Sequence, residues 1–146
     1  MEIKRSPFVI AGQNREWAKG TVVFGARGTI YLSGSAGTDP GTGKTPQAIG
    51  EQTKNALESI KTILGEYGSS LKYILHMWYC VKGSFPGGML GDPVWEEADK
   101  AMQDFWEENC PEFAVNNNPP ASTLVGVAAL AVPELKIEIQ AVAAIP

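Results

Sequence analysis

The sequence predicts an α+β domain in which two helices cover one face of a mixed β-sheet. Apolar residues recur at helical spacing over 49–67 and 93–106, and β-branched or aromatic runs stand before, between and after these segments. In chain order the runs give the arrangement ββαβαββ. Helices gathered on one face of a mixed sheet make an α+β sandwich.

The first two strands are expected to form a hairpin. Residues 21–25 and 29–33 are rich in β-branched and aromatic side chains. Arg27 and Gly28 stand between them, and glycine tolerates the positive φ that a tight turn requires. A loop rich in glycine and proline, residues 34–45, then leads to the first helix.

Both helices have recognisable ends. The helix over 49–67 meets Gly68, which can stop it in a left-handed conformation. The second helix begins at Asp92 and Pro93, where aspartate caps the first turn and proline takes the first helical position. Its apolar stripe consists of Trp95, Ala98, Met102, Phe105 and Trp106.

Residues 74–81 are expected to form a central strand, because both faces of this segment lean apolar, as in a strand covered on both sides. Two further strands are predicted at 122–130 and 135–142. A chain of 146 residues with 44% hydrophobic residues suits one globular domain with a single core. We therefore expect one domain over residues 1–146.

Charge and composition exclude several classes of function. The net charge of −4 opposes a general affinity for nucleic acid, which needs a basic surface. The sequence shows no signal-peptide pattern, and no apolar run approaches the ~20 residues that cross a bilayer. We expect a cytoplasmic protein without nucleic acid or membrane partners.

Metal and thiol chemistry have little support. His76 is the single histidine, and no second histidine or cysteine stands at metal-ligand spacing from it. His76 is therefore expected to be a packed strand residue, with the role of general base as the alternative. Cys80 and Cys110 are expected to be reduced structural thiols.

The loop over residues 37–45 superficially looks like a phosphate-binding P-loop. Thr38 occupies the position where that motif requires glycine, and Pro40 removes a backbone donor from the anion site. The loop is therefore predicted to be a surface turn.

Four motifs carry a resemblance to a known family. Residues 118–123 read Asn-Pro-Pro-Ala-Ser-Thr, and residues 135–143 read Leu-Lys-Ile-Glu-Ile-Gln-Ala-Val-Ala. Residues 31–35 add Tyr-Leu-Ser-Gly-Ser, and residues 51–57 add Glu-Gln-Thr-Lys-Asn-Ala-Leu. With these motifs the chain resembles the RidA/YjgF family of reactive enamine/imine deaminases from about Trp17 onward. The resemblance implies a chorismate-mutase-like fold and a homotrimer with sites between subunits.

The resemblance also implies which residues line the site. The family's Ser-Gly pair lines the pocket, which points to Ser33 and Gly34. Trp17 stands where the family often has a tyrosine that closes over the ligand; an aromatic wall suits a planar substrate, and packing on the first strand is the alternative. Asp99 falls where an asparagine contributes in the deaminases. The segment of the family's carboxylate clamp adds Ser122 and Thr123.

The chain departs from the family at the two positions whose side chains act most directly on the substrate. Ala121 stands where the family has an arginine that grips a substrate carboxylate, and Gln140 replaces an acidic residue. The catalytic candidates are Gln140 and Ser33. Gln140 can orient water but cannot exchange protons as a carboxyl group does. An anionic substrate would then be held by Arg15, Arg27, a lysine or backbone amides.

These features predict a hydrolytic deaminase of a small enamine or imine carboxylate that needs neither metal nor cofactor. A ring-cleavage product such as 2-aminomuconate suits Trp17 and the long loop over residues 83–93. Two alternatives come from other classes. One is a non-catalytic trimeric protein that binds small ligands or acts as a chaperone, which the two lost residues favour. The other is an endoribonuclease, an activity attributed to some relatives but opposed by the acidic charge.

Overall fold

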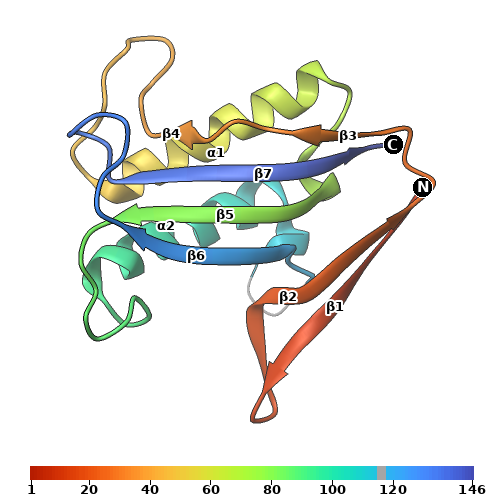
Figure 1. The fold of residues 1–146 in the computed structure, drawn as a ribbon. Coiled ribbons are helices and arrows are strands. Elements are labelled where there is room, and N and C mark those ends of the chain that lie inside the picture. Colours follow the sequence, from red (N-terminus) through yellow and green to blue (C-terminus); the bar gives the residue numbers. More distant parts are fainter. Residues whose placement is uncertain (115–117) are drawn as a thin grey trace.

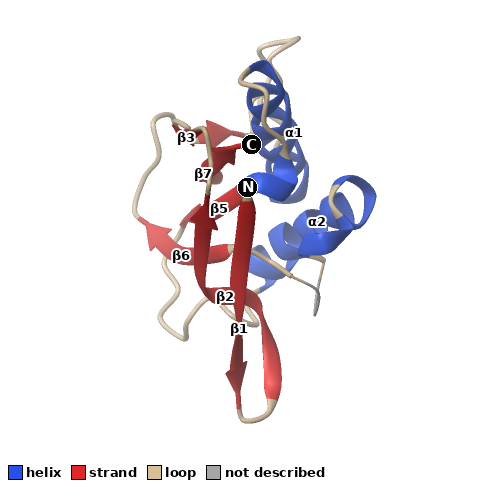
Figure 2. Ribbon diagram, turned by 90° about the vertical axis from the view of Figure 1, so that its right-hand side faces the viewer, coloured by secondary structure: helices blue, strands red, loops and turns tan. Residues whose placement is uncertain are grey.

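The computed structural model describes residues 1–114 and 118–146 of the chain. Within these residues, two α-helices, α1 (Ile49–Glu66) and α2 (Pro93–Asn109), pack on the same face of one mixed sheet (Figures 1 and 2). The predicted α+β class and its layer of two helices are confirmed. Among the described residues, no helix has the length and apolar character needed to cross a membrane.

A long antiparallel hairpin forms one edge of the sheet. It consists of β1 (Glu2–Ile10) and β2 (Gln13–Phe24), joined by a turn at Ala11 and Gly12 with φ angles of 51° and 76°. Figure 1 shows this hairpin extending away from the other strands. β2 meets the remaining sheet near Ala18, whose amide donates to the Pro120 carbonyl at 3.1 Å.

The remaining strands complete the order β1-β2-β6-β5-β7-β3. β5 (Ile74–Lys82) lies between β6 (Ala121–Val127), to which it is parallel, and β7 (Ile137–Ile145), to which it is antiparallel. β3 (Gly28–Tyr31) and the short β4 (Ser35–Ala36) both pair with β7. The central position predicted for the strand over β5 is confirmed.

The hairpin predicted between residues 21–25 and 29–33 is wrong. Gly25, with a φ of 67°, turns the chain away from β2, and the Arg27 amide then donates to the Ile145 carbonyl at 2.9 Å. β3 therefore starts on β7 instead of folding back on β2. The true partner of β2 is the edge strand β1, which contains Pro7 and shifts register on both sides of it.

Helix α1 follows the predicted pattern. Leu57, Ile60 and Leu64 are fully buried in the core. Gly68 has a φ of 71°, and the Ser69 amide donates to the Leu64 carbonyl at 2.8 Å, so the helix ends in the expected left-handed turn.

Helix α2 also begins and packs as predicted. The Asp92 carboxylate accepts a hydrogen bond from the Val94 amide at 2.9 Å, and Pro93 follows the cap. All five residues of the predicted apolar stripe are buried. Burial of this stripe sets the rotation of α2 about its own axis and so determines which of its side chains face the sheet.

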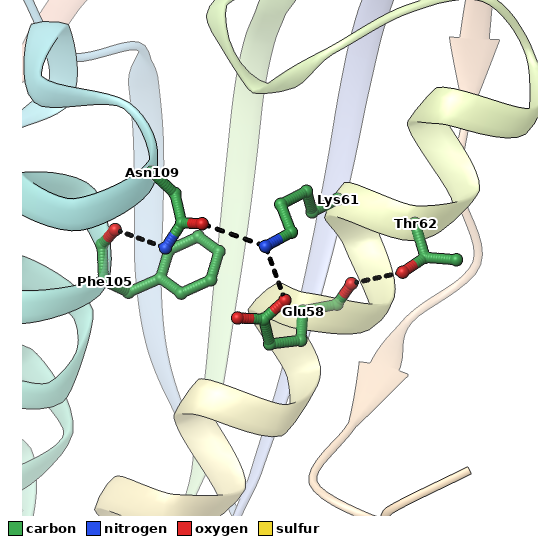
Figure 3. A network of polar contacts seen from close by, with 5 residues as sticks. All are labelled: Glu58, Lys61, Thr62, Phe105 and Asn109. Carbon is green, nitrogen blue, oxygen red and sulfur yellow. Dashed lines mark hydrogen bonds and ion pairs between the residues drawn. The ribbon is translucent and has the colours of Figure 1, made fainter. Parts of the chain in front are cut away.

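Polar contacts join the two helices near the end of α2 (Figure 3). The Lys61 ammonium of α1 donates to the Asn109 side-chain oxygen at 2.9 Å and lies 2.7 Å from the Glu58 carboxylate. Asn109 in turn donates to the Phe105 carbonyl at 3.0 Å. These contacts supplement the apolar packing of α2 against α1.

Only one face of β5 is covered within the described part of the chain. Met77 and Val81 face the helices and are fully buried, whereas Trp78 on the opposite face is 37% exposed. The two later strands are confirmed with shifted bounds, since β6 ends at Val127 and β7 starts at Ile137.

Candidate functional site

A cavity of about 310 Å³ lies between β2, the helix-facing side of β5 and β6, and α2. This volume falls in the range of small-molecule sites, roughly 300–1,000 Å³. Five of the side chains that line it are aromatic: Trp17, Tyr79, Trp95, Trp106 and Phe113.

Local structure explains why these side chains converge. On β6, Ser122 and Leu124 line the cavity because alternate strand residues face the helices. On α2, Trp95, Asp99 and Gln103 line it because residues three and four apart share one helical face. Strand and helix periodicity thus bring together residues that are distant in sequence.

Two carboxyl groups stand in this largely apolar cavity. Glu16 comes from β2 and Asp99 from α2, and their side chains are in hydrogen-bonding contact. Glu16 is an exposed residue of β2, but partial burial of its carboxyl group raises its pKa, and the charge of Asp99 and the hydrogen bond with it raise that pKa further. Burial also raises the pKa of Asp99, while the hydrogen bond from Glu16 opposes this rise. The contact between the two groups therefore raises the pKa of Glu16 and lowers that of Asp99, which favours Glu16 as the member that holds a shared proton.

Other polar groups complete the lining. Burial raises the pKa of Tyr79, as do the charges of Asp99 and Glu16, and its hydroxyl contacts the Met77 sulfur at 3.2 Å. Tyr79 is therefore a neutral phenol. The Gln103 amide donates to Asp99 at 3.4 Å, and its buried side-chain oxygen has no hydrogen-bond partner among the described residues.

Trp17, Asp99 and Ser122 are the predicted site residues that the structure brings together in this cavity. Glu16 and Gln103 were missed, because no local motif marks them. The two tryptophans of α2 were predicted as core residues and are buried as expected, and Tyr79 is buried beside them. They also wall the cavity, a role that spacing alone does not distinguish from core packing.

Thr123 and Gln140 lie on the opposite face of the sheet. They flank Trp78 in one row across β6, β5 and β7. The Gln140 amide donates to the Leu32 carbonyl at 3.2 Å. Within one chain, this pair is therefore separated from the cavity by the sheet.

Ser33 and Gly34 follow β3 and also lie outside the cavity. A Cβ atom added at Gly34 would come within 2.5 Å of the Glu138 carboxyl carbon. A side chain at this position would therefore force the Glu138 side chain to move. Ser33 is exposed and borders a shallow, open depression with Gly34 and Tyr67.

Neither arginine proposed as a replacement cation lines the cavity. The Arg27 side chain donates to the Pro146 carbonyl at the far edge of the sheet. Arg15 lines a separate pocket of about 20 Å³ together with Arg5, and Trp17 borders both spaces. Among the described residues, no lysine, arginine or histidine lines the cavity.

The remaining candidate groups behave as structural residues. His76 packs on Trp78 with ring centroids 3.9 Å apart, and burial lowers its pKa. Cys80 and Cys110 are free thiols; burial raises the pKa of both, that of Cys110 to about 11. Among the described residues, no cluster of three or more histidine, cysteine or acidic side chains could hold a metal.

The loop over residues 37–45 is a turn organised by its own aspartate. The Asp39 carboxylate accepts hydrogen bonds from the amides of Gly41 and Thr42 at 2.7 and 3.2 Å. These backbone donors are occupied and unavailable for a phosphate. The predicted surface turn is confirmed.

Comparison with known proteins now identifies the family. The family model described as "Endoribonuclease L-PSP" matches residues 15–145. The YjgF gene product of E. coli is 26% identical over 96% of this chain and 93% of its own, with a TM-score of 0.65. The chain belongs to the RidA/YjgF family. This RidA/YjgF protein therefore has the fold that its sequence motifs implied.

Two further structures of the RidA/YjgF fold are similar to it. E. coli TdcF, solved with bound serine, is 25% identical over 96% of this chain and 93% of its own, with a TM-score of 0.64. The Rid protein YyfB of Yersinia pestis is 21% identical over 99% of both chains, with a TM-score of 0.71. No curated protein matches the sequence.

Proposed function

We propose that this RidA/YjgF protein is a small-molecule deaminase that hydrolyses an enamine or imine, and that the aromatic cavity is its active site. Family membership supports a small-molecule deaminase in general. The pair formed by Glu16 and Asp99 is the observation that carries the proposal, because it supplies the proton carrier that Gln140 cannot provide. A carboxyl group with a raised pKa can act as a general acid near neutral pH.

The first step is protonation of the enamine at carbon. Glu16 gives its proton to the carbon next to the C–N unit, a C–H bond forms, and the carbon–nitrogen bond becomes an iminium. The positive charge develops beside Asp99 and the newly ionised Glu16, which both line the cavity. Both carboxylates therefore stabilise the cation as it forms.

The second stage is hydrolysis of the iminium. Water adds to the iminium carbon and gives one proton to the carboxylate pair, which leaves a neutral carbinolamine. The pair then protonates the nitrogen, ammonia departs, and the hydroxyl proton returns to the pair as the carbonyl forms. One water is consumed, one ammonia is released, and the pair ends with a single proton, as it began.

A small molecule suits the cavity better than RNA does. An RNA substrate needs basic groups for its phosphates, and among the described residues none lines the cavity. Three sequence-based expectations stay predictions: that the substrate carries a carboxylate, that it is a compound such as 2-aminomuconate, and that Ser33, Arg15 and Arg27 act on it.

The direct test is ammonia release from enamines generated freshly in the assay. We expect the protein to accelerate it for at least one member of a panel that differs in size and charge, including 2-aminoacrylate, 2-aminomuconate and an uncharged aryl enamine. Equal amounts of heat-denatured protein serve as the control. If no member is hydrolysed faster than in that control, the deaminase proposal is wrong.

We also propose that the protein is a homotrimer whose subunits meet at the open face of the sheet. Trp78 and Val125, 37% and 38% exposed, lie on this face, and exposed apolar patches on a sheet commonly mark contacts between proteins. Thr123 and Gln140 lie on the same face, so a second copy would enclose them.

Light scattering coupled to gel filtration is expected to give about three times the chain mass of 15.6 kDa. Trp78→Lys should shift the mass toward the monomer, because it places a charge in the proposed contact. The matched variant Tyr67→Lys lies after α1, away from this face, and should remain trimeric. A wild-type protein with the mass of one chain refutes the trimer.

A further inference from the structure

The wall of the cavity favours a flat or apolar body. Trp106 contacts Phe113 edge to face with centroids 5.3 Å apart, and Tyr79 lies 6.0 Å from Trp95. These packed rings form a preordered surface that holds an aromatic or aliphatic group by dispersion. The faces of tryptophan and tyrosine also attract cations. Neither property favours an anion.

The polar groups of the cavity are mostly acceptors. The carboxyl groups of Asp99 and Glu16 contact each other in the lining, and the side-chain oxygen of Gln103 lacks a partner among the described residues. Ser122 adds a hydroxyl that can donate or accept a hydrogen bond. A ligand that brings N–H donors and positive charge satisfies these acceptors, whereas a carboxylate adds a third acid group beside two.

The nearest cations lie outside the cavity. Arg5 donates to the carbonyls of Lys72 and Ile74 at 2.7 and 2.9 Å and so ties β1 to the start of β5. The pocket that Arg5 shares with Arg15 has a volume of about 20 Å³, which suits one water-sized group. The cavity itself therefore contains no clamp for a substrate carboxylate among the described residues.

We infer that the cavity selects an organic cation with an aromatic or apolar body, so that the substrate is an enamine or imine without a carboxylate. The inference rests on the proposed function only in taking the cavity as the substrate site. Ligand selectivity is measured by binding and does not require turnover. This inference departs from the sequence-based expectation that the substrate is an enamine carboxylate. The inference predicts that the cavity prefers a cation, whereas that expectation predicts that it prefers an anion.

The experiment compares three probes of nearly equal shape: 2-phenylethylammonium, 3-phenylpropionate and uncharged 2-phenylethanol. Binding to the wild-type protein is followed by calorimetry and by the emission of the tryptophans in the wall. We expect the ammonium to bind ~10- to 100-fold more tightly than the carboxylate, the range of one charged hydrogen bond. Glu16→Gln and Asp99→Asn should each reduce this preference and leave the affinity for the alcohol within about twofold, since that probe carries no charge.

Glu108→Gln is the control, because Glu108 is exposed on α2 and does not line the cavity. Equal or tighter binding of 3-phenylpropionate overturns the inference, as does failure of all three probes to bind. The wild-type comparison alone decides this point if a variant does not fold. Selective ammonium binding without ammonia release from any enamine would retain the inference and refute the deaminase, so the two failures are distinguishable.

Discussion

Asp99→Asn is expected to lower kcat for enamine hydrolysis by about 10²- to 10⁴-fold, the usual contribution of a positioned acid or base. Asparagine cannot take a proton from the attacking water, and it no longer holds the shared proton with Glu16. The measurement is ammonia release at saturating substrate, with folding checked by circular dichroism. Glu108→Gln on the exposed side of α2 should retain wild-type kcat.

Glu16→Gln should cause a loss of similar size, and the double variant should lose little more than either single variant. Groups that act as one unit do not contribute additively. Losses that multiply in the double variant would show that the two carboxyl groups work independently, which contradicts a shared proton.

The pH dependence of kcat/KM gives a second measure of the pair. The acid form of Glu16 is required, so activity is present below its raised pKa and is lost as the pH rises through it. The charges of Asp99 and Glu96 contribute to this rise, and neutral Tyr79 faces the pair. Asp99→Asn removes one of these charges, so the alkaline loss of its residual activity should move to lower pH. An unchanged alkaline limb would argue against Glu16 as the acid.

Local signals were sufficient to predict the helices. In α2, the cap at Asp92, the proline at its first position and the stripe from Trp95 to Trp106 all depend on neighbours within a few residues. The wrong hairpin has the opposite cause. Extended conformation is local, but strand pairing is not, and the charged edge strand β1 with its Pro7 lacks the alternation of a typical strand.

The candidate site shows the same division. Trp17, Asp99 and Ser122 could be named because family motifs fix their positions. Glu16 could not, because its chemistry arises from contact with Asp99, which only the packing of β2 against α2 creates. Tyr79 has the spacing of a core residue whether it packs against side chains or against a ligand. Sequence periodicity therefore predicts which residues are buried, whereas the structure shows whether they pack against other side chains or line a cavity.

Gln52→Leu is expected to destabilise the fold more than most single substitutions. Gln52 is fully buried on α1; its amide donates to the carbonyls of Pro46 and Glu134 at 2.7 and 2.9 Å, and its oxygen accepts from the Lys136 amide at 2.8 Å. These bonds tie the start of α1 to the segment that leads into β7. Gly37 packs so closely that an added Cβ would lie 2.2 Å from the Cβ of Gln52, so the leucine has little room to move.

Leucine keeps the volume but leaves three backbone groups without their partner, at ~1–3 kcal/mol for each group that water does not reach. We expect a loss of ~3–5 kcal/mol, a large share of the ~5–15 kcal/mol typical of a domain. The measurement is urea unfolding at one pH. The slope m of the unfolding free energy against urea concentration is compared between the variants to check that each unfolds in two states.

Gln103→Leu is the matched control. It is the same substitution on α2, but Gln103 makes one hydrogen bond, at 3.4 Å, and its side-chain oxygen is unpaired among the described residues. Its loss should stay within ~1 kcal/mol. Equal losses in the two variants would show that glutamine burial, and not the three bonds of Gln52, determines the stability.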